Sequence, residues 1–364
     1  MNIVLTGPMG SGKTSIGRRA AEMLDWGFAD TDGMVEDAAG RSVGEIFAEH
    51  GEAHFRQIEK DAIREISKRD RTVIATGGGA VLDPGNMRRL RMNGIIIALE
   101  APRDVLLERL KHTDERPLLA DGNSRDGLLK RHLEARARQY SNADFRIDTG
   151  AVNIEKAAER VCDIAKLPAI RICACIAGRD AKNDVERAVL GGASMVEFRL
   201  DLIPDPDVRR LVEDCAVPVI ATDRKNADNL RKAILAGCDF VDVDIHCADK
   251  DDIFEMARGR GCGTIVSVHD MNGVPDAIPE KGNADLLKVA ATLNSTDDLK
   301  KLVGLHNRRD DVIIASMGNL GGLLRVFGPM LGSYLTYCSV GKPTATGQLD
   351  LQTMNDIYRG MKLR

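Results

Sequence analysis

Two hydrophobic patterns alternate along the first part of the chain. Short apolar runs are typical of buried strands, and stretches with an apolar residue every three to four positions are typical of amphipathic helices. The predicted strands are residues 2–6, 28–30, 71–80, 94–100 and 145–149. The predicted helices are residues 15–24, 42–50, 52–69, 102–110, 128–139 and 153–166. Such alternation predicts a parallel sheet that helices cover on both faces.

The alternation starts again after Leu167, so we predict two domains, residues 1–166 and 167–364. Strand-like runs occur at 170–176, 194–200, 217–222, 240–245, 263–268, 286–292, 312–317 and 335–340. Helical patterns separate most of them, at 181–190, 227–236, 249–258 and 296–305. Eight strands alternating with helices predict a (β/α)₈ barrel, near the lower size limit of that fold. The crossover 271–285 has two prolines and little helical pattern.

Composition limits the classes of partner and the cellular compartment to be expected for this chain. A length of 364 residues fits two domains, and a net charge of −4 with 4% aromatic residues argues against a nucleic-acid or acidic-membrane partner. No signal segment precedes the first strand, and no apolar run is long enough to span a bilayer. The eight cysteines form no C-x-x-C pair, which favours buried free thiols. We therefore expect a cytoplasmic protein.

The stretch GPMGSGKT, residues 7–14, fits the phosphate-binding pattern G-x-x-x-x-G-K-[ST] between a strand and a helix. Backbone N–H groups of such a loop curl around a phosphate, and the following helix directs its positive end at the same anion. The alternative is a glycine-rich turn, which the flanking elements disfavour. The expected nucleotide-binding residues of this loop are Gly7, Gly10, Ser11, Gly12, Lys13 and Thr14.

Further features of the first domain favour a small-molecule kinase over an NTPase. Asp30 and Asp32 would lie at the end of a strand, where Asp30 with Thr14 would bind Mg²⁺, although an Asp-rich turn is an equal alternative for this segment alone. Gly77, Gly78 and Gly79 follow a strand directly, so another group should approach their backbone closely. Residues 111–127 have the composition of a lid.

These motifs together resemble shikimate kinase over residues 1–166. The resemblance rests on GPMGSGKT, DTD at 30–32, FRQIE, GGGA, RPLL and R-x-x-x-Y. It implies that Asp32 holds shikimate and accepts the proton of its hydroxyl, and that Lys13 and Arg116 neutralise the transferring phosphate. The remaining implied binding residues are Arg56 and Arg136 for the carboxylate, Gly77, Gly78 and Gly79 for shikimate, and Arg109 for adenine.

In the second domain, polar residues near predicted strand ends mark the expected site of a barrel enzyme. Lys288 lies within an apolar strand, where a buried ammonium is costly unless its pKa falls. A lysine with a depressed pKa suits Schiff-base chemistry, and His269 would stand beside it as a base. The alternative is a lysine that reaches water at the strand end. The other polar residues of this kind are Glu197, Arg199, Asp201, Arg224, Asp242, Asp244 and Ser316.

This set resembles type I 3-dehydroquinate dehydratase over residues 169–364, through segments such as MVEFRLD, ATDR, VSVHD, DLLKVA and TATGQLD. The resemblance implies that Lys288 forms an imine with the substrate ketone, that His269 removes a C2 proton, and that no metal or cofactor is needed. The implied binding residues are Glu197, Arg199, Arg224, Arg325, Thr344 and Gln348.

Three departures from that family pattern bear on the function. Asp228 stands where the family has a glutamate that partners the histidine, and Thr344 lies in T-A-T-G-Q where the family has S-A-P-G-Q. The short crossover 271–285 leaves one side of the barrel for a partner surface, either the other domain or a second protomer of a homodimer.

The sequence thus predicts a bifunctional enzyme whose small-molecule substrates are shikimate, ATP (with Mg²⁺) and 3-dehydroquinate. Its domains would catalyse 3-phosphorylation of shikimate and dehydration of 3-dehydroquinate. The competing hypothesis is an active kinase fused to an inactive barrel that serves as a binding or dimerisation module. An aldolase-like barrel is a third alternative, which the carboxylate-binding set disfavours.

Overall fold

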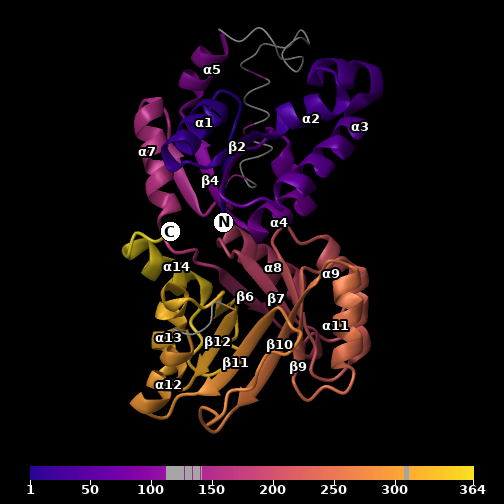
Figure 1. Ribbon diagram of the computed structural model, residues 1–364, viewed down its shortest axis with the longest axis vertical. Helices are drawn as coiled ribbons and strands as arrows, with labels where there is room; N and C mark the ends of the chain where they lie inside the picture. The colour runs from indigo at the N-terminus through magenta and orange to yellow at the C-terminus, as the bar shows by residue number, and fades with distance from the viewer. Residues whose placement is uncertain (112–126, 128–132, 134–139, 141, 307–310) are drawn as a thin grey trace. The chain divides into compact units, whose positions relative to one another are not determined.

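The computed structural model describes residues 1–111, 127, 133, 140, 142–306 and 311–364 (Figure 1). The chain divides into two compact units, Met1–Leu167 and Pro168–Arg364. The division falls one residue beyond the boundary expected from the sequence. No helix in these described ranges is long and apolar enough to cross a membrane.

The first unit contains five described strands and the helices that connect them. Its strands are β1 (Asn2–Thr6), β2 (Gly27–Asp30), β3 (Thr72–Ala75), β4 (Gly94–Glu100) and β5 (Phe145–Asp148). Its helices are α1 (Lys13–Leu24), α2 (Thr31–Ala39), α3 (Val43–Ile66), η1 (Ala80–Leu82), α4 (Pro84–Met92), α5 (Arg103–Lys111) and α7 (Ile154–Ala165).

The strands form one parallel sheet in the order β2-β3-β1-β4-β5, with helices on both faces, as predicted. The two faces follow from the alternation of side chains along each strand. Ile3 and Leu5 of β1 pack in a core with α1 and α7. Val4 between them packs in the opposite core with α3 and α4. The central strand is buried on both faces, which explains its continuous apolar sequence.

Local signals account for the main differences from the predicted elements. The predicted helices 42–50 and 52–69 form α3, which has a non-helical residue at Gly51 (φ 78°). Residues 31–39, for which a turn was an open alternative, form α2, and Asp30 caps it by accepting the N–H of Asp32 at 3.1 Å. Helix α4, which Asp83 caps ahead of Pro84, was not predicted from the sequence.

The second unit contains eight described strands. They are β6 (Ile172–Ile176), β7 (Met195–Arg199), β8 (Val219–Thr222), β9 (Phe240–Asp244), β10 (Gly263–Asp270), β11 (Leu286–Thr292), β12 (Val312–Met317) and β13 (Thr336–Ser339). The helices are α8 (Ala181–Leu190), η3 (Leu200–Leu202), α9 (Val208–Glu213), α10 (Ala227–Leu235), α11 (Lys250–Gly259), α12 (Thr296–His306), α13 (Gly321–Phe327), η4 (Gly328–Leu331) and α14 (Leu351–Gly360).

These strands form a parallel sheet in the order β12-β11-β10-β9-β8-β7-β6-β13, which curls into the predicted, nearly closed barrel. At the seam between β12 and β13, the N–H of Tyr334 donates to the carbonyl of Val312 at 2.9 Å. Beside it, the hydroxyl of Ser333 accepts the N–H of Ile314 at 3.2 Å. The described part of 271–285 contains no helix, as its sequence predicted.

Alternation along the barrel strands separates apolar from polar side chains. Leu287, Val289 and Ala291 of β11 belong to the core between strands and helices. Lys288 has the opposite orientation and lies in the barrel interior, only 5% exposed. Of the eight cysteines, all free, seven are buried and Cys247 is partly buried, in agreement with the sequence analysis.

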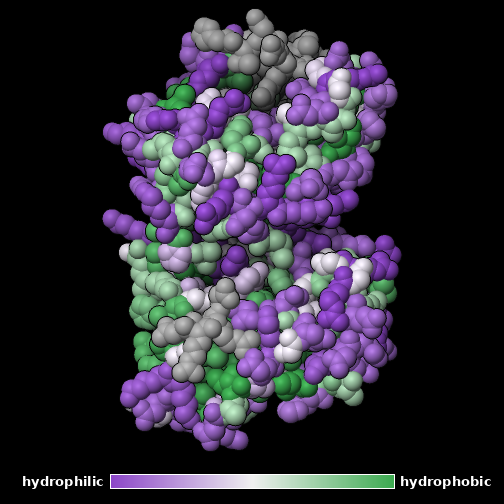
Figure 2. All heavy atoms as spheres, in the orientation of Figure 1, coloured by the Kyte–Doolittle hydropathy of each residue, from purple (hydrophilic) through white to green (hydrophobic). Residues whose placement is uncertain are grey.

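The face shown in Figure 2 is hydrophilic over most of the first unit, and hydrophobic residues gather on the second unit over α13. Leu323 and Phe327 of that helix are 48% and 43% exposed.

Candidate active sites

The loop between β1 and α1 has the geometry of a phosphate cradle. Gly7, Gly10 and Gly12 all adopt positive φ values, which only glycine reaches without strain. A Cβ on Gly7 would lie 2.3 Å from the carbonyl oxygen of Leu99. The N–H of Ser11 donates to the carbonyl of Pro8 at 3.2 Å and tightens the turn. The loop is therefore shaped to present backbone N–H groups at the start of α1.

Lys13 is the first residue of α1 and turns back over this loop. Its ammonium group donates to the carbonyl oxygens of Gly7 at 2.9 Å and Pro8 at 3.0 Å. The charge thus lies where a phosphate in the cradle would meet it.

Thr14 and Asp30 meet beside the loop. The hydroxyl of Thr14 donates to a carboxylate oxygen of Asp30 at 2.7 Å. Among the residues that the structure describes, no group of three or more His, Cys, Asp or Glu side chains could hold a metal. Hydroxyl and carboxylate oxygens fit Mg²⁺, which takes few ligands from the protein when it binds with phosphates.

Asp32 and Arg56 are the groups that approach the backbone of the three glycines after β3. A Cβ on Gly77 would lie 2.2 Å from Oδ1 of Asp32, and a Cβ on Gly79 would lie 2.4 Å from both terminal nitrogens of Arg56. The carbonyl of Gly78 accepts the hydroxyl of Tyr140 at 3.3 Å. The glycine backbone thus brings together Asp32 and Arg56, which the sequence separates by 24 positions.

Glu59 binds the guanidinium of Arg56. The guanidinium of Arg56 donates to Glu59, which is 1% exposed, at 2.9 Å and to Glu52 at 3.0 Å. Burial raises the pKa of the Glu59 carboxyl, although Arg56 opposes this. Burial also opposes the charge of Arg56, but Glu59 and Glu52 outweigh it and raise the Arg56 pKa. Arg56 is therefore charged and held in place.

Arg109 contacts the phosphate-binding loop, residues 7–14. Its guanidinium donates to the carbonyl of Gly10 at 3.2 Å and to the carbonyl of Thr149 at 2.7 Å. Arg116 and Arg136, the two remaining predicted arginines, lie outside the described residues.

In the second unit, Lys288 is surrounded by acids. Its ammonium nitrogen lies 2.8 Å from Glu197 and 2.7 Å from Asp242, with 4.4 Å to the ring centroid of Tyr337. Burial lowers the pKa of Lys288, but Asp242 and Glu197 outweigh it and raise the pKa above its ordinary value. The prediction of a depressed pKa was wrong, because the sequence could not reveal that carboxylates from β7 and β9 meet Lys288 of β11 in the barrel interior.

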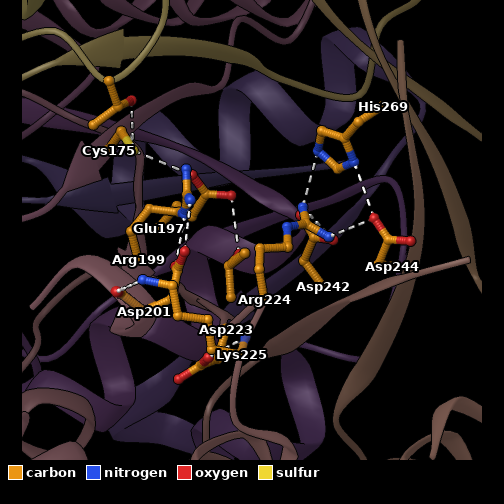
Figure 3. A network of polar contacts seen from close by, with 12 residues as sticks. Cys175, Glu197, Arg199, Asp201, Asp223, Arg224, Lys225, Asp242, Asp244 and His269 are labelled. Carbon is orange, nitrogen blue, oxygen red and sulfur yellow. Dashed lines mark hydrogen bonds and ion pairs between the residues drawn. The ribbon is translucent and has the colours of Figure 1, made fainter. Parts of the chain in front are cut away.

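Hydrogen bonds fix both carboxylates (Figure 3). Glu197 accepts from the hydroxyl of Thr222 at 3.0 Å and from the thiol of Cys175 at 3.2 Å. Asp242 accepts from the hydroxyl of Ser267 at 2.6 Å. Burial opposes ionisation of Asp242, yet Lys288 and Arg224 hold its pKa well below the usual range. Both acids are anionic, so Lys288 rests as an ammonium ion.

His269 lies between Arg224 and Asp244, as Figure 3 shows. Its Nε2 is 3.0 Å from Arg224, and its Nδ1 is 3.2 Å from Asp244. The expected partner position, Asp228, instead forms an ion pair with Arg231 at 2.8 Å, and its side chain is 72% exposed. The carboxylate beside His269 is therefore Asp244, while Asp228 lies in the first turn of α10.

Arg325 is a buried cation of α13, 2% exposed. One nitrogen donates to the carbonyl of Tyr337 at 3.3 Å, and Nε has no hydrogen-bond partner within the described ranges. Among the described residues no carboxylate acts on the charge of Arg325, and burial lowers its pKa to about 10. A buried charge of this kind favours an anionic ligand.

The remaining predicted residues flank this interior. Arg199 donates to both carboxylate oxygens of Asp201, at 2.9 and 2.8 Å. The hydroxyl oxygen of Thr344 lies 3.1 Å from Oε1 of Gln348 and 3.3 Å from the sulfur of Cys175. The structure thus connects the loop after β13 with Glu197 through Cys175.

The predicted site lacked several residues that contact it: Cys175, Thr222, Ser267 and Tyr337. Asp242 and Asp244 were expected near the strand ends without an assigned role, and as acids two positions apart in VDVDI they share one face of a strand. The neutral side chains carried no such signal.

Comparisons with known proteins match each unit separately. The family model of shikimate kinase matches residues 9–166, and that of type I 3-dehydroquinase matches residues 172–364. A shikimate kinase of Caldanaerobacter subterraneus subsp. tengcongensis is 48% identical over 160 residues, which are 44% of this chain and 93% of that protein.

Two solved structures are similar to parts of the chain. Shikimate kinase from Acinetobacter baumannii in complex with shikimate is 34% identical, with a TM-score of 0.43, covering 45% of this chain and 92% of that one. The 3-dehydroquinate dehydratase from Geobacillus kaustophilus is 21% identical, with a TM-score of 0.46, covering 53% of this chain and 92% of that one.

Proposed function

Because the chain belongs to two families, the shikimate kinases through its first unit and the type I 3-dehydroquinases through its second, we propose that it performs both reactions. The first unit would transfer the terminal phosphoryl group of ATP to the 3-hydroxyl of shikimate. The second would dehydrate 3-dehydroquinate to 3-dehydroshikimate. Both substrates are small anions, and both sites contain buried or half-buried arginines.

The contact of Asp32 and Arg56 with the glycines 77–79 carries the kinase assignment. Arg56 would bind the carboxylate of shikimate together with Arg136, because a guanidinium matches a carboxylate with two parallel hydrogen bonds. Asp32 would accept the proton that the 3-hydroxyl loses. Lys13 would neutralise charge on the phosphate oxygens, assisted by Arg116, while Arg109 would flank adenine.

Mg²⁺ would be held by Thr14 and Asp30 in this proposal. When bound, it supplies positive charge beside the phosphate oxygens of ATP. The residues of the chain supply the rest: the loop 7–14 orients the nucleotide, and Asp32 and Arg56 orient the acceptor.

The burial of Lys288 between two carboxylates carries the dehydratase assignment. An ammonium ion has no lone pair, so Lys288 must first transfer a proton, and Glu197 and Asp242 are the acceptors within 2.8 Å. The amine would attack the C3 ketone and release water to form an imine. His269 would take a C2 proton, and the electrons of that C–H bond would flow toward the imine.

The C1 hydroxyl would then leave as water, with the proton that His269 has taken. Hydrolysis would restore the ketone and Lys288. Arg325 would bind the substrate carboxylate near Thr344 and Gln348, and Glu197, Arg199 and Arg224 would orient the ring hydroxyls. The unpaired burial of Arg325 supports the carboxylate assignment.

Borohydride trapping tests the imine. Reduction of the chain in the presence of 3-dehydroquinate should leave a stable mass increase on the peptide that contains Lys288. Lys288→Ala should give no adduct, because no amine remains at that position. Absence of an adduct on the unchanged chain, together with absence of dehydration, would contradict the dehydratase proposal.

The competing hypothesis of an inactive barrel rested on Asp228 and the short crossover. The contact between His269 and Asp244 removes the first reason, because a carboxylate is present beside the base. A homodimer through the barrel, which the helix-free crossover 271–285 favours, stays a prediction that the mass of the chain in solution would decide. The free thiols suit a reducing, cytoplasmic environment.

A further inference from the structure

The two ring nitrogens of His269 have different partners. Nε2 faces a nitrogen of Arg224 at 3.0 Å, and Nδ1 faces Oδ2 of Asp244 at 3.2 Å. Figure 3 shows the imidazole with one contact on each side. The side chains of His269 and Asp244 are 30% and 32% exposed, so a ligand in the barrel can reach this group.

The chemistry of these partners fixes the tautomer. A guanidinium has only N–H donors, so Nε2 must accept from Arg224 with its lone pair. A neutral imidazole then carries its proton on Nδ1, where the carboxylate of Asp244 accepts it. The contacts therefore leave Nε2 as the basic atom of His269.

The fold determines which carboxylate fills this role. Asp242 and Asp244 share the inner face of β9, and Asp244 pairs in register with Ser267 of β10, two residues before His269. The other oxygen of Asp244 accepts the N–H of His246 at 3.0 Å, which holds the carboxylate in place. Asp228 is bound to Arg231 on α10 instead.

We propose that Asp244 is the positioning residue that holds His269 in the Nδ1–H tautomer and stabilises the imidazolium formed during dehydration. The proposal rests on the proposed dehydratase function. In the step concerned, the C2 proton moves to Nε2, the Nδ1 proton stays on His269, and Asp244 keeps its charge. Arg224 transfers its hydrogen bond from Nε2 to the substrate.

The charges around His269 come from three neighbouring elements: Arg224 after β8, Asp242 and Asp244 of β9, and Lys288 of β11. Burial lowers the pKa of His269, Arg224 and Lys288 lower it further, and the two acids oppose them. The net effect is a pKa of His269 below its ordinary value, so the ring stays neutral down to a lower pH. Loss of the Asp244 charge removes one opposing contribution, so the pKa should fall further.

The test compares Asp244→Asn with Asp228→Asn in the full chain. We expect D244N to lower kcat for dehydration by about 100-fold, typical of weakened acid–base catalysis, with KM changed much less. The acid limb of its pH profile should move to lower pH. D244E should recover part of kcat, and D228N should match the unchanged chain in rate and pH profile.

Nitrogen NMR of histidine-labelled protein gives a second reading that does not depend on turnover. The signals of His269, assigned by their loss in H269Q, should show protonated Nδ1 and unprotonated Nε2 at neutral pH. A protonated Nε2, or a pH profile that moves in D228N and not in D244N, would overturn the proposal.

Two controls separate the alternative failures. Retained kinase activity of D244N would show that its first unit is intact, and circular dichroism would report the barrel. Absence of dehydration by the unchanged chain would refute the proposed function itself. Dehydration by the unchanged chain with full activity of D244N would refute only the role of Asp244.

Discussion

Lys288 keeps its charge inside the barrel because Glu197 and Asp242 lie within 2.8 Å of its ammonium group. An isolated buried ammonium would lose its proton, whereas a paired one with satisfied hydrogen bonds does not. Reaction of Lys288 as an amine therefore requires that it first transfer a proton to one of these carboxylates.

In the first unit, the position of the Arg56 guanidinium depends on the absence of a side chain at Gly79. A methyl group there would lie 2.4 Å from the guanidinium nitrogens of Arg56. We expect Gly79→Ala to raise KM for shikimate about tenfold or more, because a displaced guanidinium loses a charge-assisted hydrogen bond. Steady-state kinetics with shikimate varied at saturating ATP would measure this.

Gly33→Ala is the matched control, since its Cβ would meet only Asp30 Cβ at 4.0 Å within the described atoms. An equal rise of KM in both variants would contradict the placement of Arg56 in the shikimate site.

At the scale of elements, the barrel depends on its seam. β12 and β13 form no ladder in the described structure, and Ser333 bridges them by accepting from Ile314 and donating to the carbonyl of Leu335 at 2.8 Å. The side chain is buried at the seam, with Ser333 5% exposed. One serine thus substitutes for part of a strand pairing.

Ser333→Ala should therefore destabilise the barrel locally by about 1–3 kcal/mol, the cost of a buried N–H without a partner. Hydrogen exchange should become faster at Ile314 and Tyr334, while amides of β1 in the other unit serve as the internal reference. Unchanged protection at Ile314 would mean that the hydroxyl does not close the seam.

At the scale of the whole molecule, the two sites use separate residues. Lys13 contacts its own loop, and every partner of Lys288 lies in the second unit. We expect Lys13→Ala to lower kinase turnover at least about 100-fold, through lost charge stabilisation, without changing dehydration. Separate assays of both activities on one preparation would check this; a parallel loss would reveal energetic coupling.

The sequence predicted much of the fold because its signals are local. Strands such as 94–100 and 286–292 agree with the structure residue for residue, since apolar runs and helical periods record burial directly. Helices α2, α4 and α9 were missed, because short polar helices depend on caps and packing more than on periodicity. Helix α14 was also missed, although Leu351, Met354 and Tyr358 have helical spacing.

The sequence by itself determined the two families and the order of most elements, because motif spacing and alternation are properties of the chain. It also predicted Lys13, Asp32, His269 and Lys288 as site residues. Only the tertiary structure decided that Lys288 is charged and that Asp244, not Asp228, meets His269. Both outcomes depend on which side chains the barrel brings within 3.2 Å of one another. Glu197 of β7 and Asp242 of β9 meet Lys288 of β11 in the interior, whereas Asp244 of β9 meets His269 of the neighbouring strand β10. Electrostatic energy at such distances is therefore set by the tertiary fold.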